Sequence, residues 1–294
     1  MASNRKVTVV IPTYGRAHLL MDTIPTYLQP DVELLILIDD HSPDDTYAVV
    51  KKLMAIYSNI QYYRNEKNLK QTISKNRGKA MVQTEYVYFG DDDSILSQGG
   101  IQLLLQTAQS TQSDIVGASA VYLKFEKEVI SETLANRIFA TSVDEIVNLP
   151  KLAFNFSLQT SEVWEVPVCH AAFLARTELV KNINFDDGFI GNCYREETDF
   201  LLRCRSKNAK IVLQSNVTQT NLPPTLATGG ARSRGRLLYE YFALYNTIRF
   251  VFKNKSILKM VDGRCRPIPM ILQYVYARFR AVARRTLESV KKIS

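Results

Sequence analysis

The chain has 294 residues, of which 46% are apolar and 22% are charged, so it can bury a sizeable core. No stretch offers the roughly eighteen uncharged apolar residues that a membrane-spanning helix needs, and the N-terminus lacks a signal-peptide pattern, so we expect a cytoplasmic protein. The four cysteines and three histidines stand singly, which argues against a zinc centre and favours reduced thiols.

The net charge of +8 is distributed unevenly. Residues 229–294 contain fifteen Lys and Arg against three Asp and Glu, whereas the preceding 228 residues are mildly acidic. We therefore divide the chain into a main domain, 1–228, and a basic, aromatic-rich helical region, 229–294, which is the part that would meet an anionic partner.

Short β-branched or aromatic runs alternate with helical segments along the first 124 residues. This alternation predicts βαβ units, and hence an α/β fold with a mostly parallel sheet flanked by helices. The predicted strands are 6–12, 33–38, 60–64, 86–89, 114–118 and 120–124, and the predicted helices are 17–28, 45–58 and 71–84. Further along we expect an irregular region at 125–165, an extended segment at 166–176, a helix from 177, a helix whose first turn holds Glu196, a closing strand at 210–213 and basic helices from about 234.

Polar loops follow three of the predicted strands, at Pro12, at Asp39 and at Asp91. Right-handed crossovers bring the carboxyl ends of parallel strands to the same edge of a sheet, where open α/β sheets bind their ligands. The sequence therefore predicts one cleft with an acidic wall.

Asp91, Asp92 and Asp93 form the most acidic of these loops. Alternate residues of an extended segment point the same way, so Asp91 and Asp93 could share a ligand. A hard divalent cation carrying a phosphate suits them, since Mg²⁺ or Mn²⁺ takes one or two carboxylates plus substrate phosphates. The alternative is a solvated turn in which Asp93 or Ser94 caps a helix that runs through Leu103.

Four segments, in this order, resemble the family 2 glycosyltransferases, which are inverting enzymes of GT-A (Rossmann-like) fold. They are residues 9–16 (VVIPTYGR), 38–46 (IDDHSPDDT), 89–93 (FGDDD) and 194–199 (YREETD). The resemblance covers roughly residues 5–215. It implies transfer of a sugar from a nucleotide-diphosphate donor, most readily a UDP-sugar, to a glycan, polysaccharide or glycolipid acceptor.

The resemblance also implies where the donor binds. The first loop would lie against the nucleotide, Asp40 would accept a hydrogen bond from the base, and the Asn76–Arg77 pair falls where similar enzymes carry a nucleotide-contacting Arg-Asn pair. The residues assigned in this way to the nucleotide-sugar are Pro12, Thr13, Tyr14, Arg16, Asp40, Asn76, Arg77, Asp91 and Asp92.

For the chemistry, Asp91 and Asp93 match the DXD motif, which holds Mn²⁺ or Mg²⁺ on the diphosphate and offsets the charge of the leaving group. Glu196 and Glu197 occupy the position of the family's Glu-Asp pair, whose second member is the usual base. We expect Glu197 to deprotonate the acceptor hydroxyl, with Glu196 as the alternative.

Two positions bear on whether a histidine takes part in the site. Many relatives carry a histidine after the strand at 210–213, often as a further metal ligand, and this chain has Asn216, Gln219 and Asn221 there. His170 lies near the acceptor side in the family's layout, and we favour a core or supporting role for it over an acceptor contact.

These roles divide the main domain into a nucleotide-sugar half, 1–124, and an acceptor half, 125–228. The basic region would either lie on an anionic membrane surface, at the inner face of the membrane, or pack on the catalytic domain with a solvated basic face. The loop 229–232 would close over the diphosphate, with Arg232 as a cation, or serve as a linker.

Two other classes stay open at this point. A nucleic-acid-binding protein would use the basic region, although an acidic cleft opposes it. A nucleotidyltransferase would keep the fold, although the first strand–helix turn lacks a glycine-rich phosphate loop.

Overall fold

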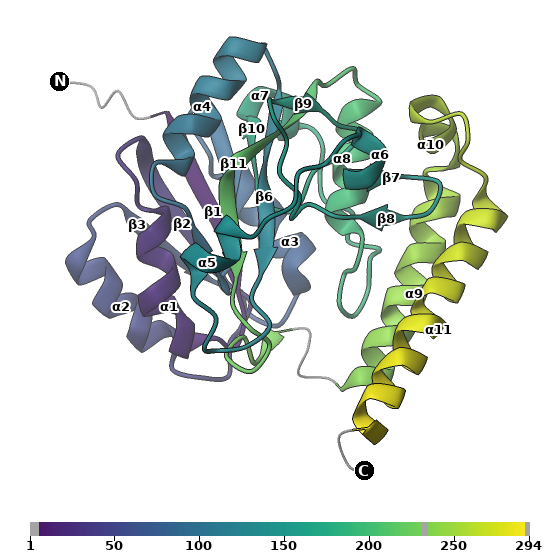
Figure 1. Cartoon of the computed structure of the whole chain (residues 1–294). Coiled ribbons are helices and arrows are strands. Elements are labelled where there is room, and N and C mark those ends of the chain that lie inside the picture. The colour runs from purple at the N-terminus through teal and green to yellow at the C-terminus, as the bar shows by residue number, and fades with distance from the viewer. Residues whose placement is uncertain (1–5, 231–234, 292–294) are drawn as a thin grey trace.

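The β-branched and aromatic runs form the strands of one curled sheet (Figure 1). The computed structural model describes residues 6–230 and 235–291. The strand order is β3-β2-β1-β4-β10-β6-β11-β5, with β9 paired to β11. Strands β10, β5 and β9 run antiparallel to their neighbours, and the pairs between β1, β2, β3 and β4 and between β6 and β11 are parallel.

The strands of this sheet are β1 (Val7–Thr13), β2 (Val32–Asp39), β3 (Ile60–Arg64), β4 (Tyr86–Phe89), β5 (Ser94–Leu96), β6 (Ile115–Tyr122), β9 (Trp164–Glu165), β10 (Phe173–Arg176) and β11 (Ile211–Asn221). A separate pair is formed by β7 (Val147–Asn148) and β8 (Ala153–Phe154). The helices are α1 (Ala17–Thr23), the 3₁₀ turn η1 (Ile24–Tyr27), α2 (Thr46–Ile56), α3 (Lys70–Ala80), α4 (Gly100–Thr111), α5 (Ile130–Ala135), α6 (Val143–Ile146), α7 (Thr177–Lys181), α8 (Glu196–Arg205), α9 (Arg236–Lys253), α10 (Lys255–Val261) and α11 (Pro267–Lys291).

Alternation along β1 separates two hydrophobic cores, one on each face of the sheet. Val9 and Ile11 pack with side chains of α1, α2 and α4, whereas Val10 belongs to the core on the other face, with Phe200 of α8. Helix α3 also lies on that second face, and Gly78 lets it approach closely, because a Cβ there would lie 2.5 Å from Cγ1 of Val10. This close contact fixes α3 beside the carboxyl ends of the strands.

The polar loops meet at one edge of the sheet, as the sequence predicts. The Asp40 amide donates to the carbonyl oxygen of Thr13 at 2.9 Å, and the Gly90 amide donates to that of Val10 at 3.1 Å. The ends of β1, β2 and β4 are thus tied together by backbone hydrogen bonds.

The structure corrects the prediction of a helix directly after the acidic triplet. Ser94 does not open a helix there. Instead Ser94–Leu96 forms β5, in which Ile95 pairs with Thr220, and α4 begins only at Gly100, after Gly99 at φ +71°. Pairing with a distant strand outweighs the local helix-capping signal.

Two predicted strands were also too short. The predicted break between the strands 114–118 and 120–124 lies inside β6, which runs unbroken over Ile115–Tyr122. The predicted strand 210–213 stops where the apolar run of β11 ends, although β11 itself continues. Beyond Leu213, β11 continues through polar residues that are nearly all buried, because β6 pairs with them on both sides of a bulge between Gln214 and Thr218.

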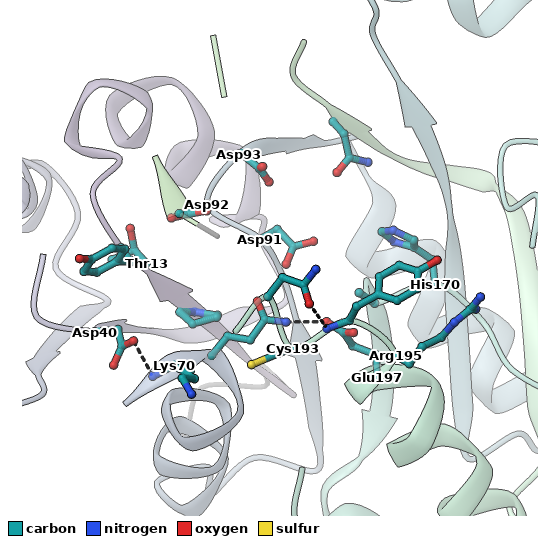
Figure 2. Close-up of a pocket in the computed structure, with 18 of the residues that line it drawn as sticks. Thr13, Asp40, Lys70, Asp91, Asp92, Asp93, His170, Cys193, Arg195 and Glu197 are labelled. Carbon is teal, nitrogen blue, oxygen red and sulfur yellow. Dashed lines mark hydrogen bonds between the residues drawn. The ribbon is translucent and has the colours of Figure 1, made fainter. Parts of the chain in front are cut away.

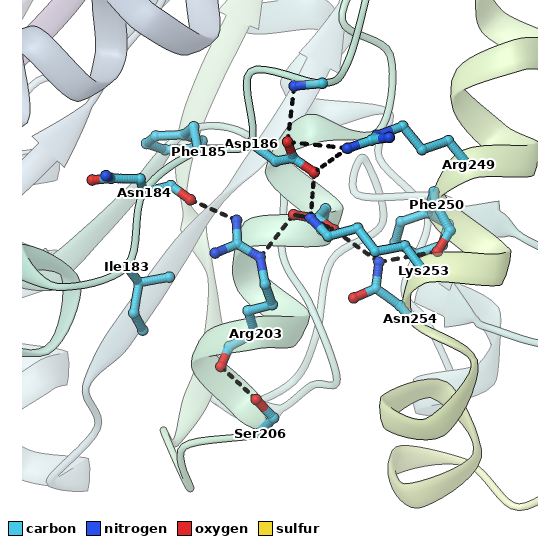
Figure 3. Close-up of polar contacts among 12 residues, drawn as sticks. Ile183, Asn184, Phe185, Asp186, Arg203, Ser206, Arg249, Phe250, Lys253 and Asn254 are labelled. Atoms are coloured by element: carbon cyan, nitrogen blue, oxygen red, sulfur yellow. Dashed lines mark hydrogen bonds and ion pairs between the residues drawn. The ribbon is translucent and has the colours of Figure 1, made fainter.

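Ion pairs join helix α9 to the main domain (Figure 3). Helix α11 lies alongside α9 (Figure 1). Arg249 and Lys253 bind Asp186, and Lys253 also lies 2.8 Å from the buried Asp199 of α8. The Asn254 amide donates to Asp199 as well, at 2.8 Å. The C-terminal helices therefore pack on the domain through a buried polar anchor.

Apolar side chains extend this contact. Phe250, Val251, Leu258 and Met270 belong to the same buried cluster as Phe200. Over the described parts of the chain, we find no helix that combines the length and the apolar character needed to cross a bilayer.

We expect Asp199→Ala to lower the free energy of unfolding by about 2–4 kcal/mol, because it leaves Lys253 and Asn254 without their buried acceptor. Urea denaturation measures this change. Asp144→Ala is the matched control, since it removes an exposed ion pair with Arg264 and should change stability little. Equal stability of the two variants would contradict the anchor.

Candidate active site

A cavity of about 460 Å³ lies at the edge of the sheet where β1, β2 and β4 end. Figure 2 shows Asp40 and Lys70 at one end of it, the Asp91–Asp93 triplet along one wall, and His170, Arg195 and Glu197 at the other end. The predicted site residues that line it are Pro12, Thr13, Tyr14, Arg16, Asp40, Asp91, Asp92, Asp93 and Glu197. Residues from four distant parts of the sequence thus line one cavity.

Arg16 neutralises the acidic triplet. Its Nη1 donates to Oδ1 of Asp92, and its Nη2 lies 3.1 Å from Oδ2 of Asp93. Burial by itself would lower the pKa of Arg16, but the three carboxylates outweigh burial and raise it above its usual value. The guanidinium therefore stays charged in the cavity wall and offsets the repulsion between these carboxylates.

The segment after β11 lies against Arg16. A Cβ at Gly230 would come within 2.9 Å of Nη2 of Arg16, and one at Gly229 within 2.3 Å of the carbonyl oxygen of Gly15. Both glycines have positive φ, which suits residues without a side chain. Gly230 lines the cavity, whereas Arg232 lies outside the described residues.

Asp91 is held by the chain segment in which relatives carry the extra histidine. Gln219, fully buried on β11, donates from Nε2 to Oδ2 of Asp91 at 3.0 Å and accepts a hydrogen bond from Tyr88 at 2.9 Å. Asn221 lines the cavity, and Asn216 is exposed in the bulge. The glutamine thus orients Asp91 without adding a negative charge.

The donor set around the triplet fits a divalent cation that arrives with a phosphate. Asp91 and Asp93 supply two carboxylates, while the described residues hold no group of three His, Cys, Asp or Glu side chains that could hold a metal. Mg²⁺ and Mn²⁺ bind through such small sets of carboxylates because substrate phosphates and water complete their coordination.

Asp40 closes the start of α3. Its Oδ1 accepts from the Leu69 amide and from Nδ2 of Asn65, and its Oδ2 accepts from the Lys70 amide, at 2.7–2.8 Å. The carboxylate is 4% exposed and lines the cavity. These backbone bonds fix the turn that presents Lys70 and Gln71 to the cavity.

Asn76 and Arg77 lie outside the lining of the cavity. Asn76 makes a reciprocal pair of hydrogen bonds with the backbone of Phe185, each 2.8 Å long. Arg77 donates to Oδ1 of Asn65 at 2.7 Å and to the carbonyl oxygen of Arg64. The helical turn of α3 points these side chains away from the cavity, where they support the frame of the site, and their contact with the nucleotide stays a prediction.

Glu196 and Glu197 begin α8 but have different environments. The Glu196 side chain is completely buried and does not line the cavity, whereas that of Glu197 is 19% exposed and does. Lys75 and Gln71 of α3 both donate to these two carboxylates. Sequence reasoning missed both α3 residues, and the only available signal was a lysine four residues after a glutamine on a helix beside the sheet.

The far wall of the cavity is aromatic, which the sequence did not indicate. His170 accepts the Ala172 amide on Nδ1 at 3.2 Å, and its Nε2 lies 3.0 Å from the Tyr122 hydroxyl. Burial lowers the pKa of His170 to about 4, so the ring is neutral near pH 7. Phe156 packs edge-on against it, and Arg195 lies over the ring of Phe154. This wall offers flat apolar surfaces with few charges.

Comparison with known proteins identifies the relatives of this chain. The family model "Glycosyl transferase family 2" matches residues 8–183. The cholesterol galactosyltransferase of Borreliella burgdorferi is 32% identical over 290 residues, covering 92% of this chain and 74% of the relative. A Campylobacter jejuni enzyme, GalNAc(5)-diNAcBac-PP-undecaprenol beta-1,3-glucosyltransferase, is 28% identical over 224 residues, covering 72% and 67%.

Solved structures share the fold at low sequence identity. Residues 1–349 of Staphylococcus aureus TarS, in complex with UDP-GlcNAc, give a TM-score of 0.60 at 16% identity, with 88% of this chain and 72% of that 349-residue segment covered. The mannosyltransferase PcManGT of Pyrobaculum calidifontis, in complex with GDP-Man and Mn²⁺, gives 0.59 at 14% identity, with 92% and 69% covered. Together with the family match, these findings establish that the chain belongs to glycosyl transferase family 2 and is a glycosyltransferase with the GT-A fold.

Proposed function

We propose that this enzyme transfers a sugar from a UDP-sugar to an acceptor hydroxyl with inversion, using a divalent metal on the diphosphate and Glu197 as the general base. The observation that carries the proposal is that Asp40, the Asp91–Asp93 triplet and Glu197 line one cavity. Acidic groups brought together in this way can divide the labour between holding a metal diphosphate and accepting a proton.

At the donor end, Thr13 ends β1 and Tyr14 follows it, and both would lie against the nucleotide, beside Asp40. A Mn²⁺ or Mg²⁺ held by Asp91 and Asp93 would supply electrostatic stabilisation of the departing diphosphate. Arg16 pairs with Asp92 and with Asp93, one of these two carboxylates, and a metal bound there would displace it from Asp93.

At the acceptor end, Glu197 lies next to the aromatic wall. An acceptor hydroxyl bound there would give up its proton to Glu197 as it attacks the sugar. His170, being neutral, can serve this end as a hydrogen-bond partner. Its bond with Tyr122 supports the interpretation of His170 as a residue that shapes the acceptor side.

We further propose a lipid-linked or lipid acceptor, presented at an anionic membrane surface at the inner face of the membrane. The relatives named above include enzymes whose names specify undecaprenol-linked and cholesterol acceptors. In this chain Tyr239 of α9 lines the cavity, and the exposed Leu237, Leu238 and Tyr241 are its neighbours on the same helix. An acceptor head group in the cavity would thus leave its lipid beside an apolar helix.

Exposed apolar side chains continue along both long helices at helical spacing. On α11 they include Phe279, which is 72% exposed, and on α9 Leu237, which is 88% exposed. The two stripes are Leu237, Tyr241, Tyr245, Ile248 and Phe252 on α9, and Ile268, Leu272, Tyr276 and Phe279 on α11. Apolar stripes on a region rich in Lys and Arg suit an interfacial position on anionic lipid.

The two other classes are less favourable. The cavity wall carries the acidic triplet, which would repel nucleic-acid phosphate. Family membership favours sugar transfer over nucleotidyl transfer.

We expect Glu197→Gln to reduce sugar transfer by about 10²–10⁴-fold while UDP binding is retained, because it removes only the proton acceptor. Transfer from radiolabelled UDP-sugars to lipid acceptors in vesicles measures the first quantity, and calorimetry with UDP measures the second. Glu178→Gln is the matched control, as an exposed first-turn glutamate of another helix, α7. Full activity of Glu197→Gln would rule out this base.

Arg16→Gln should lower the melting temperature in the absence of metal and increase the stabilisation by Mn²⁺ with UDP, because the triplet loses its resident cation. Thermal unfolding with and without MnCl₂ and UDP provides the readout. The control is Arg64→Gln, which removes an ion pair with Asp39 of β2 and leaves the cavity wall intact. Identical Mn²⁺ effects in wild type and Arg16→Gln would contradict the placement of the metal.

Wild-type protein should co-sediment with phosphatidylglycerol vesicles more than with phosphatidylcholine vesicles, and salt should weaken this binding. Replacing Leu272 and Phe279 by Ser should abolish it, since both side chains are exposed on α11. Replacing the exposed Met54 and Ile56 of α2 by Ser is the control and should leave binding intact. Unchanged binding of the α11 variant would refute the membrane surface.

A further inference from the structure

Lys75 occupies a position where a lysine is costly. It lies in the middle of α3, is 1% exposed, and its ammonium sits 5.3 Å from the centre of the Phe185 ring. Burying an ammonium in this way is unfavourable unless carboxylates and hydrogen bonds compensate it. A specific partner must therefore explain it.

The partners are the two glutamates that begin α8. Lys75 Nζ donates to Oε1 of Glu197 at 2.7 Å and to Oε1 of Glu196 at 2.9 Å. Gln71, one turn earlier on α3, donates from Nε2 to the same two oxygens, at 3.0 Å and 2.6 Å. Two donors from one helix thus grip two acceptors from another, and both of these bonds to Glu197 fall on a single oxygen.

The charges of this cluster do not balance if both glutamates are ionised, since one ammonium would then face two buried carboxylates. Burial, reinforced by the neighbouring Glu197, raises the pKa of Glu196 well above its usual value. Oε2 of Glu196 is buried and has no hydrogen-bond partner among the described residues. Burial also opposes ionisation of Glu197, but the ammonium of Lys75 outweighs it and lowers the pKa of Glu197. Of the two, Glu196 is therefore the glutamate whose neutral form is favoured, and Glu197 the one whose ionised form is favoured.

Lys79, one turn further along α3, provides a contrast within the same helix. It is 5% exposed, and its Nζ donates to the carbonyl oxygens of Val180 and Ile183 and to Oδ1 of Asn184. Burial lowers the pKa of Lys79 to about 8, whereas the carboxylates keep that of Lys75 above its usual value. Lys75 is thus a fixed cation and Lys79 a structural donor to carbonyls.

We propose that Lys75, assisted by Gln71, is a positioning residue for sugar transfer, holding Glu197 ionised and fixed at the cavity wall with Glu196 as its neutral neighbour. Lys75 itself does not line the cavity, so it acts through Glu197 and not on substrate. The inference rests on the proposed role of Glu197 as the base.

Other ionisable groups also face Glu197. They are Asp91 after β4, His170 before β10 and Cys193 before α8. Burial keeps His170 neutral near pH 7 and raises the pKa of the Cys193 thiol to about 12, so neither supplies charge there. Lys75 is the cation that contacts Glu197 directly.

The test is the pH profile of kcat for Lys75→Gln, from about pH 3.5 to 9.5, a range that reaches below the usual glutamate pKa because Lys75 lowers the pKa of Glu197. The base works when deprotonated, so activity is lost as the pH falls through its pKa. Without the ammonium that pKa rises, and the acid limb should move upward by at least about one pH unit, so that the rate at a pH on the wild-type acid limb falls about tenfold or more. KM for the UDP-sugar should change little, and Lys75→Arg should restore the wild-type profile.

Lys79→Gln is the matched control, because it removes a buried lysine from the same helix without touching Glu197. It should lower the melting temperature and leave the acid limb in place. Gln71→Leu removes a neutral donor from the same Glu197 oxygen, so it leaves no unpaired charge and should shift the limb upward by less. If Lys75→Gln does not fold, Gln71→Leu decides the matter.

An acid limb that stays in place in Lys75→Gln, or in Gln71→Leu where that variant decides, would overturn the proposal. This outcome differs from failure of the proposed function. In that case wild type would transfer no sugar, or Glu197→Gln would retain full activity. An inactive Glu197→Gln combined with an unmoved limb in Lys75→Gln would reject the positioning role alone.

Discussion

Repulsion among carboxylates at one edge of the sheet is the constraint on which this site depends. Like charges at this spacing are tolerated only when each finds a compensating group. Arg16 serves Asp92 and Asp93, and Lys75 serves Glu196 and Glu197. Each cation comes from a different element, so folding of the sheet and α3 is what assembles the acidic wall.

The two cations lie beside carboxylates for which we propose different roles. Arg16 lies in the cavity wall, on carboxylates that suit a metal, and is in a position to be displaced by one. Lys75 is buried behind the wall and is held by Glu196, Glu197 and the Phe185 ring, so it has no such freedom. A cation in the cavity wall at one end and a buried, fixed cation at the other fit the proposed division of the site between a metal diphosphate and a base.

The C-terminal helices belong to the site as well as to the surface. Their attachment through Asp186 and Asp199 joins α9 to the segment that leads into Glu197 and to the helix that Glu197 begins. Asn246 of α9 also holds the backbone of Ile190. The same helix therefore braces the acceptor end, contributes Tyr239 to the cavity and exposes an apolar stripe to its surroundings.

Local patterns were enough for strands β1 to β4 and for the meeting of the carboxyl ends of β1, β2 and β4. The run Val7–Thr13 and the run Val32–Asp39 are so rich in β-branched and aliphatic residues that no other reading competes. The sequence did not predict strands at Ser94–Leu96 or in the polar half of β11, because their strand character comes from pairing with each other. The direction of the Asn76 side chain could not be predicted, because it depends on where its helix docks.

By itself the sequence determined the α/β class, the acidic loops at strand ends and the position of Glu197 in a helix's first turn, because each depends on neighbours a few residues away. Only the tertiary structure decided which charges meet. Lys75 and Glu197 are separated by 122 residues and Arg16 and Asp92 by 76. The first pairing follows from the packing of α3 against the sheet at Gly78, and the second follows from the pairing of β1 with β4. No local pattern encodes either contact.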